Sequence, residues 1–243
     1  MGIVYKQPHE NAVFSYYTSN GKEIILEKKL ILDSLQYSHE IIDEFKEFRV
    51  DVFSILGMRN LSSFIGEIFA ASIVKQSNGF FRKNPHQDGY PDLLTMDEEG
   101  QLLWTKLKLR LREKQPFSPF ANGGIEVKAT CGSVPTPQKC KKMGIIKPDI
   151  GDQRINVLNS YDWKAHHRET NNLLGILWDF IYGIPRIVAI FFSNNLTIDD
   201  WGNIIKPKTG GGRTTSVSIM PRTGVKKMYE GTLFVIDDIR YHY

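Results

Sequence analysis

The chain has 243 residues, enough for one large domain or two small ones. Hydrophobic residues make up 41% of it and charged residues 24%, which is typical of a globular protein and excludes disordered or collagen-like chains. The 31 Lys and Arg residues only slightly outnumber the 27 Asp and Glu residues. Net charge alone therefore does not predict a nucleic-acid partner.

The sequence shows neither a membrane segment nor an export signal. The longest apolar run, 187–192, is far shorter than the ~20 residues that a spanning helix needs. The N-terminus lacks the pattern of a secretory signal, and Lys6 occupies the place where a myristoylation signal requires Ser or Thr. Two cysteines, Cys131 and Cys140, are too few for a disulfide framework. We expect a cytoplasmic protein without membrane contact.

Two helices are predicted in the first third of the chain. Residues 33–51 are rich in acidic side chains, and their apolar residues recur every three or four positions, which is the period of an amphipathic helix. Residues 62–75 repeat this period after Ser62, a candidate N-cap, and Asn78-Gly79 ends the pattern. The acidic first segment would repel a phosphate backbone, so we interpret residues 1–59 as helical scaffold.

Strands and one long helix are predicted after residue 78. The β-forming or alternating runs are 79–83, 90–96, 102–112, 124–130 and 187–192, with a hairpin turn at 97–100. In 106–112, apolar and basic residues alternate strictly, so a strand there would point leucines inward and cations outward. A long helix is expected over 162–182, ending near Gly183 and Pro185. This order predicts a single α/β domain with a central mixed sheet flanked by helices.

Charged residues at one buried strand carry the chemical signal. Glu126 and Lys128 are two positions apart in Gly124-Ile125-Glu126-Val127-Lys128, so on a strand they share a face. If this strand pairs with the strand after Tyr90-Pro91-Asp92, the carboxylates of Asp92 and Glu126 meet. Converging carboxylates repel unless a cation lies between them, and oxygen ligands suit Mg²⁺. Lys128 beside such an ion could hold or help deprotonate a water that attacks phosphorus.

These residues resemble the two motif elements of the PD-(D/E)xK nuclease superfamily: Pro91-Asp92 matches the first, and Glu126-Val127-Lys128 the second. The resemblance covers about residues 60–195 and implies a restriction-endonuclease-like core, with Asp92 and Glu126 as Mg²⁺ ligands and Lys128 orienting the attacking water. It also makes Glu67, on the preceding helix, an assisting carboxylate. The gap between Asp92 and Glu126 is long for this family. Without the expected pairing, Asp88 or Asp97 could replace Asp92, and a surface strand with an exposed ion pair is the structural alternative.

Candidate DNA contacts lie outside the motif strands. Residues 201–229 contain no acidic residue, which favours a polyanion partner, and we place DNA-binding elements in residues 200–243. Arg213 and Arg222 are candidates for reading guanine in the major groove. A basic loop near the motif strand is expected to contact backbone phosphates. The predicted DNA-binding residues are Lys139, Lys141, Lys142, Lys208, Arg213 and Arg222.

Other motifs carry weaker signals. His166 and His167 could join the two cysteines as zinc ligands, but the cysteine spacing is too wide for a structural zinc site. The glycines at 210–212 lack the rest of a phosphate-binding motif, so a mobile loop and a loop that enters a DNA groove remain equal alternatives. Met58 and Arg59 could insert into a minor groove, although a turn between helices explains them more simply.

The function that the resemblance implies is that of a type II restriction endonuclease. Such an enzyme hydrolyses double-stranded DNA at specific sequences with Mg²⁺ and leaves 5′-phosphate ends. A homodimer is expected because two-fold symmetry places one active site on each strand of a palindrome, and a cognate DNA methyltransferase is the expected partner in the same system. The alternatives are a repair or junction-resolving nuclease of the same superfamily and a non-catalytic DNA-binding module.

Overall fold

A computed structural model describes residues 3–9, 14–133, 135–147, 163–166, 168–207, 216–238 and 241. Its centre is a seven-stranded mixed sheet in the order β1-β11-β9-β8-β6-β5-β4. Strands β6 and β8 run parallel, and every other neighbouring pair is antiparallel. The strands are β1 (Tyr5–Lys6), β4 (Phe81–Lys83), β5 (Leu93–Thr95), β6 (Gly124–Thr130), β8 (Leu173–Ile181), β9 (Ile184–Ser193) and β11 (Thr232–Ile236).

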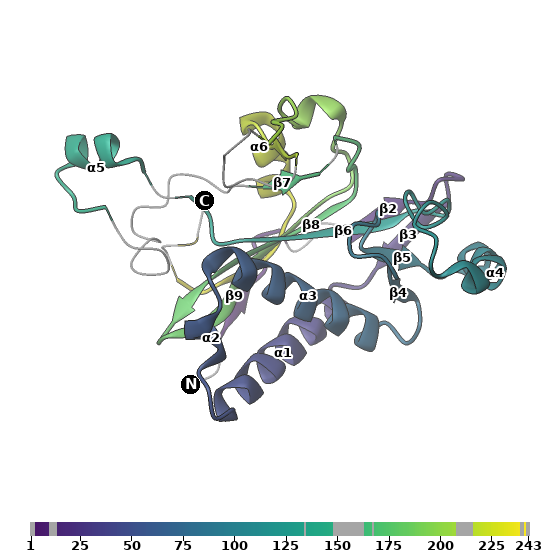
Figure 1. Ribbon diagram of the computed structural model, residues 1–243, viewed down its shortest axis with the longest axis horizontal. Helices are drawn as coiled ribbons and strands as arrows, with labels where there is room; N and C mark the ends of the chain where they lie inside the picture. The colour runs from purple at the N-terminus through teal and green to yellow at the C-terminus, as the bar shows by residue number, and fades with distance from the viewer. Residues whose placement is uncertain are drawn as a thin grey trace.

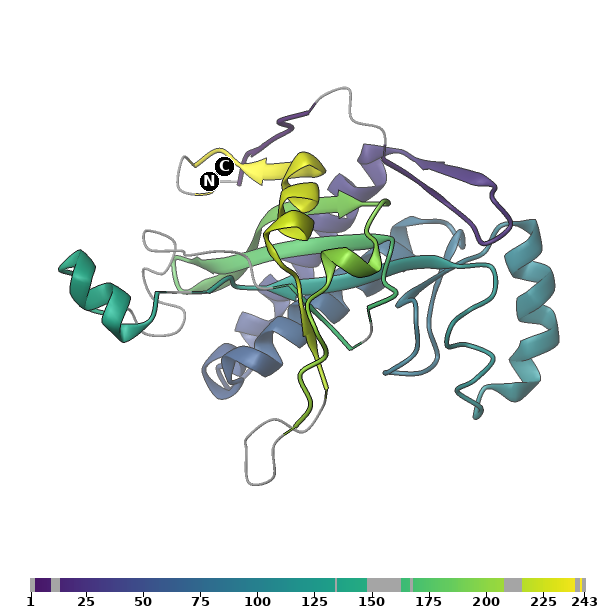
Figure 2. The same ribbon diagram turned by 90° about the horizontal axis from the view of Figure 1, so that it is seen from above.

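Two small antiparallel sheets and several helices surround the central sheet. One small sheet pairs β2 (Phe14–Tyr17) with β3 (Glu23–Leu26), and the other pairs β7 (Lys164–Ala165) with β10 (Ser218–Ile219). In Figure 1, helices α1 and α3 lie below the central sheet and α6 lies above it, whereas α5 stands away from it in both ribbon views (Figures 1 and 2). The α-helices are α1 (Lys28–Glu44), α2 (Val52–Ile55), α3 (Met58–Gln76), α4 (Glu98–Leu107), α5 (Pro137–Met143) and α6 (Arg222–Glu230).

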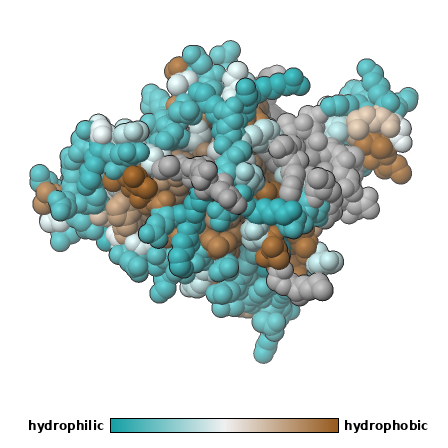
Figure 3. Space-filling model, turned by 180° about the vertical axis from the view of Figure 1, so that it is seen from behind, coloured by the Kyte–Doolittle hydropathy of each residue, from teal (hydrophilic) through white to brown (hydrophobic). Residues whose placement is uncertain are grey.

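Each face of the sheet has its own hydrophobic core, which explains why β8 and β9 are apolar over most of their length. Leu174, Ile176 and Trp178 pack with α1 and α3 on one face. Leu173 and Leu177 pack with the β7–β10 sheet and α6 on the other. The sheet is therefore covered on both sides over its central strands. On the face seen in Figure 3, the exposed apolar side chains form separate groups among hydrophilic ones.

The predicted fold class is confirmed as α/β with a mixed central sheet flanked by helices. The helix expected over 62–75 is α3, the amphipathic acidic segment forms most of α1, and strands occur within 79–83, 90–96, 124–130 and 187–192. No helix in the described part of the chain is long and apolar enough to cross a membrane.

The strand expected over 102–112 is wrong, because this segment belongs to α4 and the short 3₁₀ helix Lys108–Arg110. Asp97 is the N-cap rather than part of a hairpin turn, since its side chain accepts a hydrogen bond from the Gly100 amide at 3.0 Å. Helix α4 packs one side against a small core around Phe117. Leu109, expected inside, is 89% exposed, so the alternation of leucines and cations did not reflect a buried face.

The long helix expected over 162–182 is also wrong, since its second half is the strand β8. Its apolar residues fit a helix of three- to four-residue period, but a strand buried on both faces is equally continuous in apolar residues. Tyr182 and Gly183, at positive φ angles of 52° and 76°, form the turn into β9. Residues 162 and 167 lie outside the described residues.

The flanking segments contribute strands as well as the expected elements. Residues 1–59 contain α1 and α2 but also β1, β2 and β3, so this part is not purely helical. Residues 200–243 contain α6 but also β10 and β11, and β11 lies inside the central sheet between β1 and β9. Both ends of the chain thus complete the sheet that carries the site.

A partly buried histidine joins α1 to the central sheet. The Ile187 amide donates a hydrogen bond to His39 Nε2 at 3.1 Å, and the neighbouring Arg186 forms an ion pair with Asp43 at 2.6 Å. Burial and the positive charge of Arg186 lower the pKa of His39 from 6.5 to about 4. The folded protein therefore holds this imidazole neutral, while the unfolded chain takes up a proton near pH 6.5.

We expect the free energy of unfolding to decrease as the pH falls from about 6.5 toward 4, because acid then protonates His39 preferentially in the unfolded chain. Between pH 6.5 and 5, His39 accounts for about 2 kcal/mol, at 1.36 kcal/mol per pH unit. Urea unfolding of the wild type and of His39→Gln at several pH values measures how much His39 contributes to the pH dependence of the free energy of unfolding. An equal pH dependence in both proteins would refute the assignment.

Candidate active site

Asp92 stands immediately before β5 and completes its pairing with β6. The backbone ladder between these strands pairs Leu93 with Ile125 and Leu94 with Gly124. Two residues beyond Ile125 on β6, the Val127 amide donates instead to the side chain of Asp92, Oδ2, at 2.9 Å. A carboxylate therefore takes the place of a backbone carbonyl at this point of the sheet. This bond fixes the direction of the Asp92 side chain.

A buried asparagine holds the turn that precedes Asp92. The side-chain amide of Asn84 donates to the carbonyls of Pro91 and Phe117, each at 2.9 Å, and its backbone amide donates to the Asp92 carbonyl at 2.8 Å. The Tyr90–Pro91 peptide bond within this turn is cis. Asn84 thus positions Asp92 from outside the motif. Nothing in the local sequence pattern marked Asn84 as functional.

Strand β6 presents its two charged side chains on one face, as predicted. Ile125 and Val127 belong to the core beneath α3, so the alternating residues Glu126 and Lys128 point away from it. The strand lies between β5 and β8, and its register with β8 pairs Glu126 with Leu173 and Lys128 with Gly175. Its backbone is therefore held from both sides, which leaves little freedom in the placement of these charged groups.

The three charged groups of the two motif elements meet. Lys128 Nζ lies 2.5 Å from Glu126 Oε1 and 3.4 Å from Asp92 Oδ2. The side chain of Glu126 is only 5% exposed, whereas those of Asp92 and Lys128 are 27% and 23% exposed. One ammonium group therefore bridges two carboxylates at the edge of solvent. The surface strand with an exposed ion pair does not describe this arrangement, because Glu126 is buried.

The protonation of this group follows from its burial and charges. Burial raises the pKa of Glu126 to about 7; the Lys128 ammonium opposes this rise and the Asp92 charge adds to it. Burial alone lowers the pKa of Lys128, but the carboxylates of Glu126 and Asp92 outweigh it and raise that pKa above the usual range. Lys128 is therefore a charged hydrogen-bond donor. In this state it cannot accept a proton from a water.

A cavity of about 350 Å³ opens over these groups. Helix α3 borders it on one side and β7 on the other, and these elements lie on opposite sides of β6 in Figure 1. Its walls mix carboxylates with cationic side chains, which is suited to an ion or to a charged ligand rather than to an apolar molecule. The charged or ionisable lining residues are Glu67, Lys83, Asp88, Asp92, Glu126, Lys128, Lys164 and His166.

The donor set fits a divalent cation held by two carboxylates. Glu126 Oε2 is buried and has no hydrogen-bond partner, an arrangement that costs free energy unless a cation or donor reaches the oxygen. Asp92 and Glu126 supply the hard oxygen ligands that Mg²⁺ prefers. Among the described residues, however, no group of three or more His, Cys, Asp and Glu side chains is close enough to hold a metal. Water or phosphate oxygens would have to complete the coordination shell.

The other predicted carboxylates do not join Asp92 and Glu126. Glu67 lines the cavity from α3 but forms an ion pair with Lys83 of β4. Asp88 lies on the cavity wall with an exposed side chain. Asp97 caps α4 and pairs with Lys22 at 3.1 Å, away from the cavity. The alternative in which Asp88 or Asp97 replaces Asp92 is therefore unnecessary, since the expected pairing of β5 with β6 is present.

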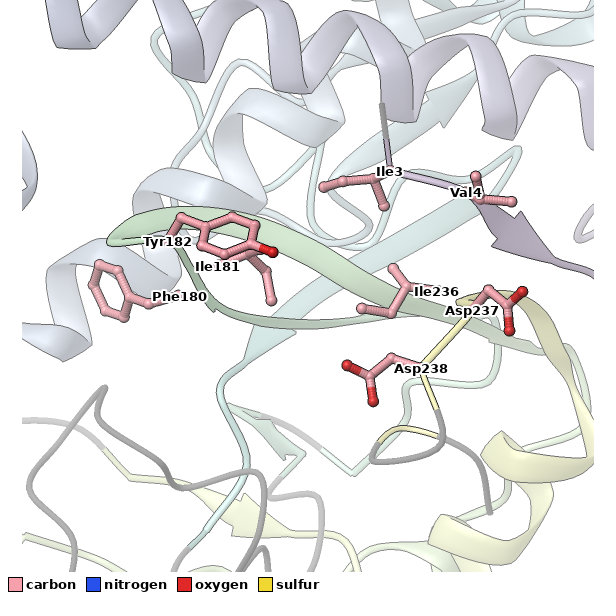
Figure 4. Close-up of a pocket in the computed structure, with 8 residues that line it drawn as sticks. All are labelled: Ile3, Val4, Phe180, Ile181, Tyr182, Ile236, Asp237 and Asp238. Carbon is pink, nitrogen blue, oxygen red and sulfur yellow. The ribbon is translucent and has the colours of Figure 1, made fainter. Parts of the chain in front are cut away.

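A second hollow of about 500 Å³ lies at the far end of β8 and β11. Figure 4 shows its walls, which are mainly apolar side chains from Ile3 and Val4, the β8–β9 turn and Ile236. Its carboxylates are those of Asp237, paired with Lys6, and Asp238. The lining residues include no Lys, Arg or His and no Ser, Thr or Cys. We place the candidate site at the motif strands for this reason.

The predicted DNA-binding residues divide into described and undescribed ones. Lys139, Lys141 and Lys142 lie on α5, a short helix rather than the expected loop. Arg222 is the first residue of α6. Lys208 and Arg213 lie outside the described residues, as do the glycines at 210–212.

In the structure, an acidic residue from outside the acid-free stretch 201–229 neutralises one of its cations. Lys227, one of its cations, pairs with the buried Asp200 at 2.6 Å, just before the stretch begins. The same ammonium group also donates to the Asn195 carbonyl at 3.0 Å. Lys227 therefore contributes to the packing of α6 more than to a surface for a polyanion.

The remaining candidates receive no support as a metal site. The described part of the chain contains no cluster in which His166, Cys131 and Cys140 could hold zinc, and His167 lies outside it.

Met58 and Arg59, the candidates for insertion into a minor groove, begin α3 instead of forming a turn between helices. Their side chains are not among those described.

Sequence reasoning missed two residues at the site. Asn84 positions Asp92, and Lys164 lines the cavity from β7; the helix predicted over 162–182 concealed the second. Comparisons with models of protein families, with curated proteins and with solved structures found no match to this chain.

Proposed function

We propose that this protein is a Mg²⁺-dependent endonuclease that cleaves double-stranded DNA. The observation that carries the proposal is the convergence of Asp92, Glu126 and Lys128 at one cavity, with a buried oxygen of Glu126 left unpaired. Two carboxylates and an ammonium group in this order along the chain resemble the motif of the PD-(D/E)xK nucleases. The α/β fold with a mixed sheet is compatible with a restriction-endonuclease-like core.

The charge of each residue determines its proposed role. Asp92 and Glu126 would hold the cation, which supplies Lewis-acid activation of the phosphodiester when bound. The Lys128 ammonium donates hydrogen bonds, so it can orient the attacking water and stabilise the negative charge that develops on the phosphate. Its raised pKa argues against a role as general base in the metal-free protein. Glu67, paired with Lys83, would assist only if that ion pair opens.

The basic residues of α5 are candidates for binding the phosphates of the DNA backbone. Lys139, Lys141 and Lys142 follow β6 along the chain, on a helix that stands away from the sheet (Figure 2). Arg222, the first residue of α6, is a further candidate DNA contact, and the sequence adds Lys208 and Arg213, which lie outside the described residues. Lysine contacts to phosphates contribute affinity without sequence preference. We assign sequence readout to Arg213 and Arg222, because arginine can bond guanine in the major groove.

We favour a type II restriction endonuclease that acts as a homodimer and has a cognate methyltransferase. A repair or junction-resolving nuclease would use the same three residues, and a non-catalytic DNA-binding module would use the basic surfaces alone. The proposals differ in substrate. The first cuts unmodified plasmid DNA at discrete sites, the second prefers branched DNA, and the third binds DNA without cutting it.

The deciding experiment is digestion of plasmid DNA and of a four-way junction with Mg²⁺, followed by end mapping. We expect discrete plasmid fragments with 5′-phosphate ends, and no cleavage in EDTA. Preferential cutting of the junction would favour the resolving nuclease. Binding without cleavage in Mg²⁺ or Mn²⁺ would contradict the assignment of an active site.

A further inference from the structure

The candidate site has a second wall that the nuclease motif does not include. Strand β7 and the residue after it supply this wall, with Lys164, Ala165 and His166 lining the cavity opposite α3. This strand belongs to the small β7–β10 sheet rather than to the central sheet. The carboxylates and the cationic wall therefore come from two separate sheets, and a ligand in the cavity would touch both.

The direction of Lys164 follows from its neighbours on β7. Trp163 and Ala165 are each only 1% exposed and belong to the core between the two sheets. Consecutive residues of a strand point to opposite sides, so Lys164 faces away from that core and is exposed. The backbone is fixed on both sides of it, because Lys164 pairs with Ile219 and the Met220 amide donates to the Trp163 carbonyl at 3.0 Å.

We propose that Lys164 is a substrate-positioning residue that binds a phosphate of the DNA backbone from the side opposite Asp92 and Glu126. This inference rests on the proposed nuclease function. A phosphodiester between the carboxylates and β7 has oxygens that face away from the cation, and these oxygens need a donor. Lys164 provides a positive charge on that side. The same charge makes it unsuitable as a metal ligand, so its contribution is to the substrate.

The test measures how duplex binding depends on salt. Neutralising one phosphate releases counterions, so each phosphate contact adds about 0.9 to the magnitude of the slope of log K against log[salt]. Removing one contact therefore lowers that magnitude by about 0.9. We expect Lys164→Met to reduce the slope by about 0.9 and to weaken binding about tenfold at 0.1 M salt. Fluorescence anisotropy of a labelled duplex in Ca²⁺ between 50 and 200 mM KCl measures both, without any cleavage.

The matched control is Lys29→Met, which removes the same charge from an exposed residue of α1 that does not line the cavity. It should retain the wild-type slope. Lys164→Arg should keep the wild-type slope, since it keeps the positive charge. The Mg²⁺ concentration that gives half-maximal cleavage should be the same in Lys164→Met and in the wild type. Thermal unfolding checks that each variant folds, and Lys164→Gln serves as a second neutral variant.

The outcomes separate the two proposals. If the wild type binds and cuts DNA but Lys164→Met has the slope of Lys29→Met, only the role of Lys164 is overturned. A changed Mg²⁺ requirement in Lys164→Met would overturn it too. So would a reduced slope in a folded Lys164→Arg. If the wild type neither binds duplex DNA in Ca²⁺ nor cuts it in Mg²⁺, the nuclease function itself fails.

Discussion

Asp92→Asn and Glu126→Gln should each reduce Mg²⁺-dependent DNA cleavage by about 10³-fold or more while the duplex still binds in Ca²⁺. Each substitution removes one negative charge from the pair that would hold the cation, and losing several kcal/mol of electrostatic stabilisation corresponds to such a factor. The shapes are nearly unchanged. In Asp92→Asn, the new side-chain carbonyl oxygen can still accept the hydrogen bond from the Val127 amide, so we expect this variant to fold. Plasmid cleavage under single-turnover conditions measures the loss.

The control for this pair is Asp88→Asn, because Asp88 is an exposed carboxylate on the wall of the same cavity. It removes an equal charge from nearly the same place and should leave the rate within a few fold of the wild type. Thermal unfolding of all three variants shows whether they fold. Wild-type cleavage by both Asp92→Asn and Glu126→Gln would exclude this site, whatever the outcome for Asp88→Asn.

Gly124→Ala should destabilise the protein by about 3 kcal/mol or more, because overpacking between fixed backbones is costly. A Cβ atom at Gly124 would lie 1.9 Å from the Leu93 carbonyl oxygen and 2.9 Å from Pro91 Cγ. Neither neighbour can rotate away, so β5 and β6 would have to separate. Leu93 and Pro91 flank Asp92, and cleavage should therefore fall together with stability.

Urea unfolding measures the stability loss, and the matched control is Gly57→Ala. A Cβ atom at Gly57 has no neighbour within 4 Å, and Gly57 has a negative φ angle of −60° as the N-cap of α3. Its replacement should cost less than about 1 kcal/mol. Equal stability of the two variants would show that the close approach of β5 to β6 at Gly124 does not matter.

The motif strand could be predicted from sequence because two independent signals agreed there. The alternation of Ile125 and Val127 with Glu126 and Lys128 indicated one apolar and one charged face, and β6 has both. The pairing with β5, on which the meeting of Asp92 and Glu126 depends, was an expectation that the structure confirms. These features are encoded within a few neighbouring residues.

The failures arose where local patterns fit two structures. An apolar run suits a buried strand as well as a helix, and only the cores on both faces of the sheet decide between them, as for β8. For α5, the local sequence does contain the signals of a helix. Thr136 caps the helix, Pro137 occupies its first turn, and Gly144 ends it in a left-handed conformation, a pattern typical of helix ends.

The second wall of the site and the support from Asn84 depend on distant segments. Asn84 acts through the carbonyls of Pro91 and Phe117, and the latter is 33 positions away in sequence. Lys164 reaches the cavity only because β7 pairs with β10. No periodicity within either segment contains this information, so three-dimensional placement was required to find them.

The hydrogen bond from the Val127 amide to Asp92 links the backbone of β6 directly to a proposed metal ligand. A cation bound by the Asp92 carboxylate withdraws electron density from the oxygen that accepts this bond. The amide resonance of Val127 should therefore shift when Mg²⁺ or Ca²⁺ is titrated into the protein. A nuclear magnetic resonance experiment could then report ligand binding at the level of a single backbone proton, independently of catalysis.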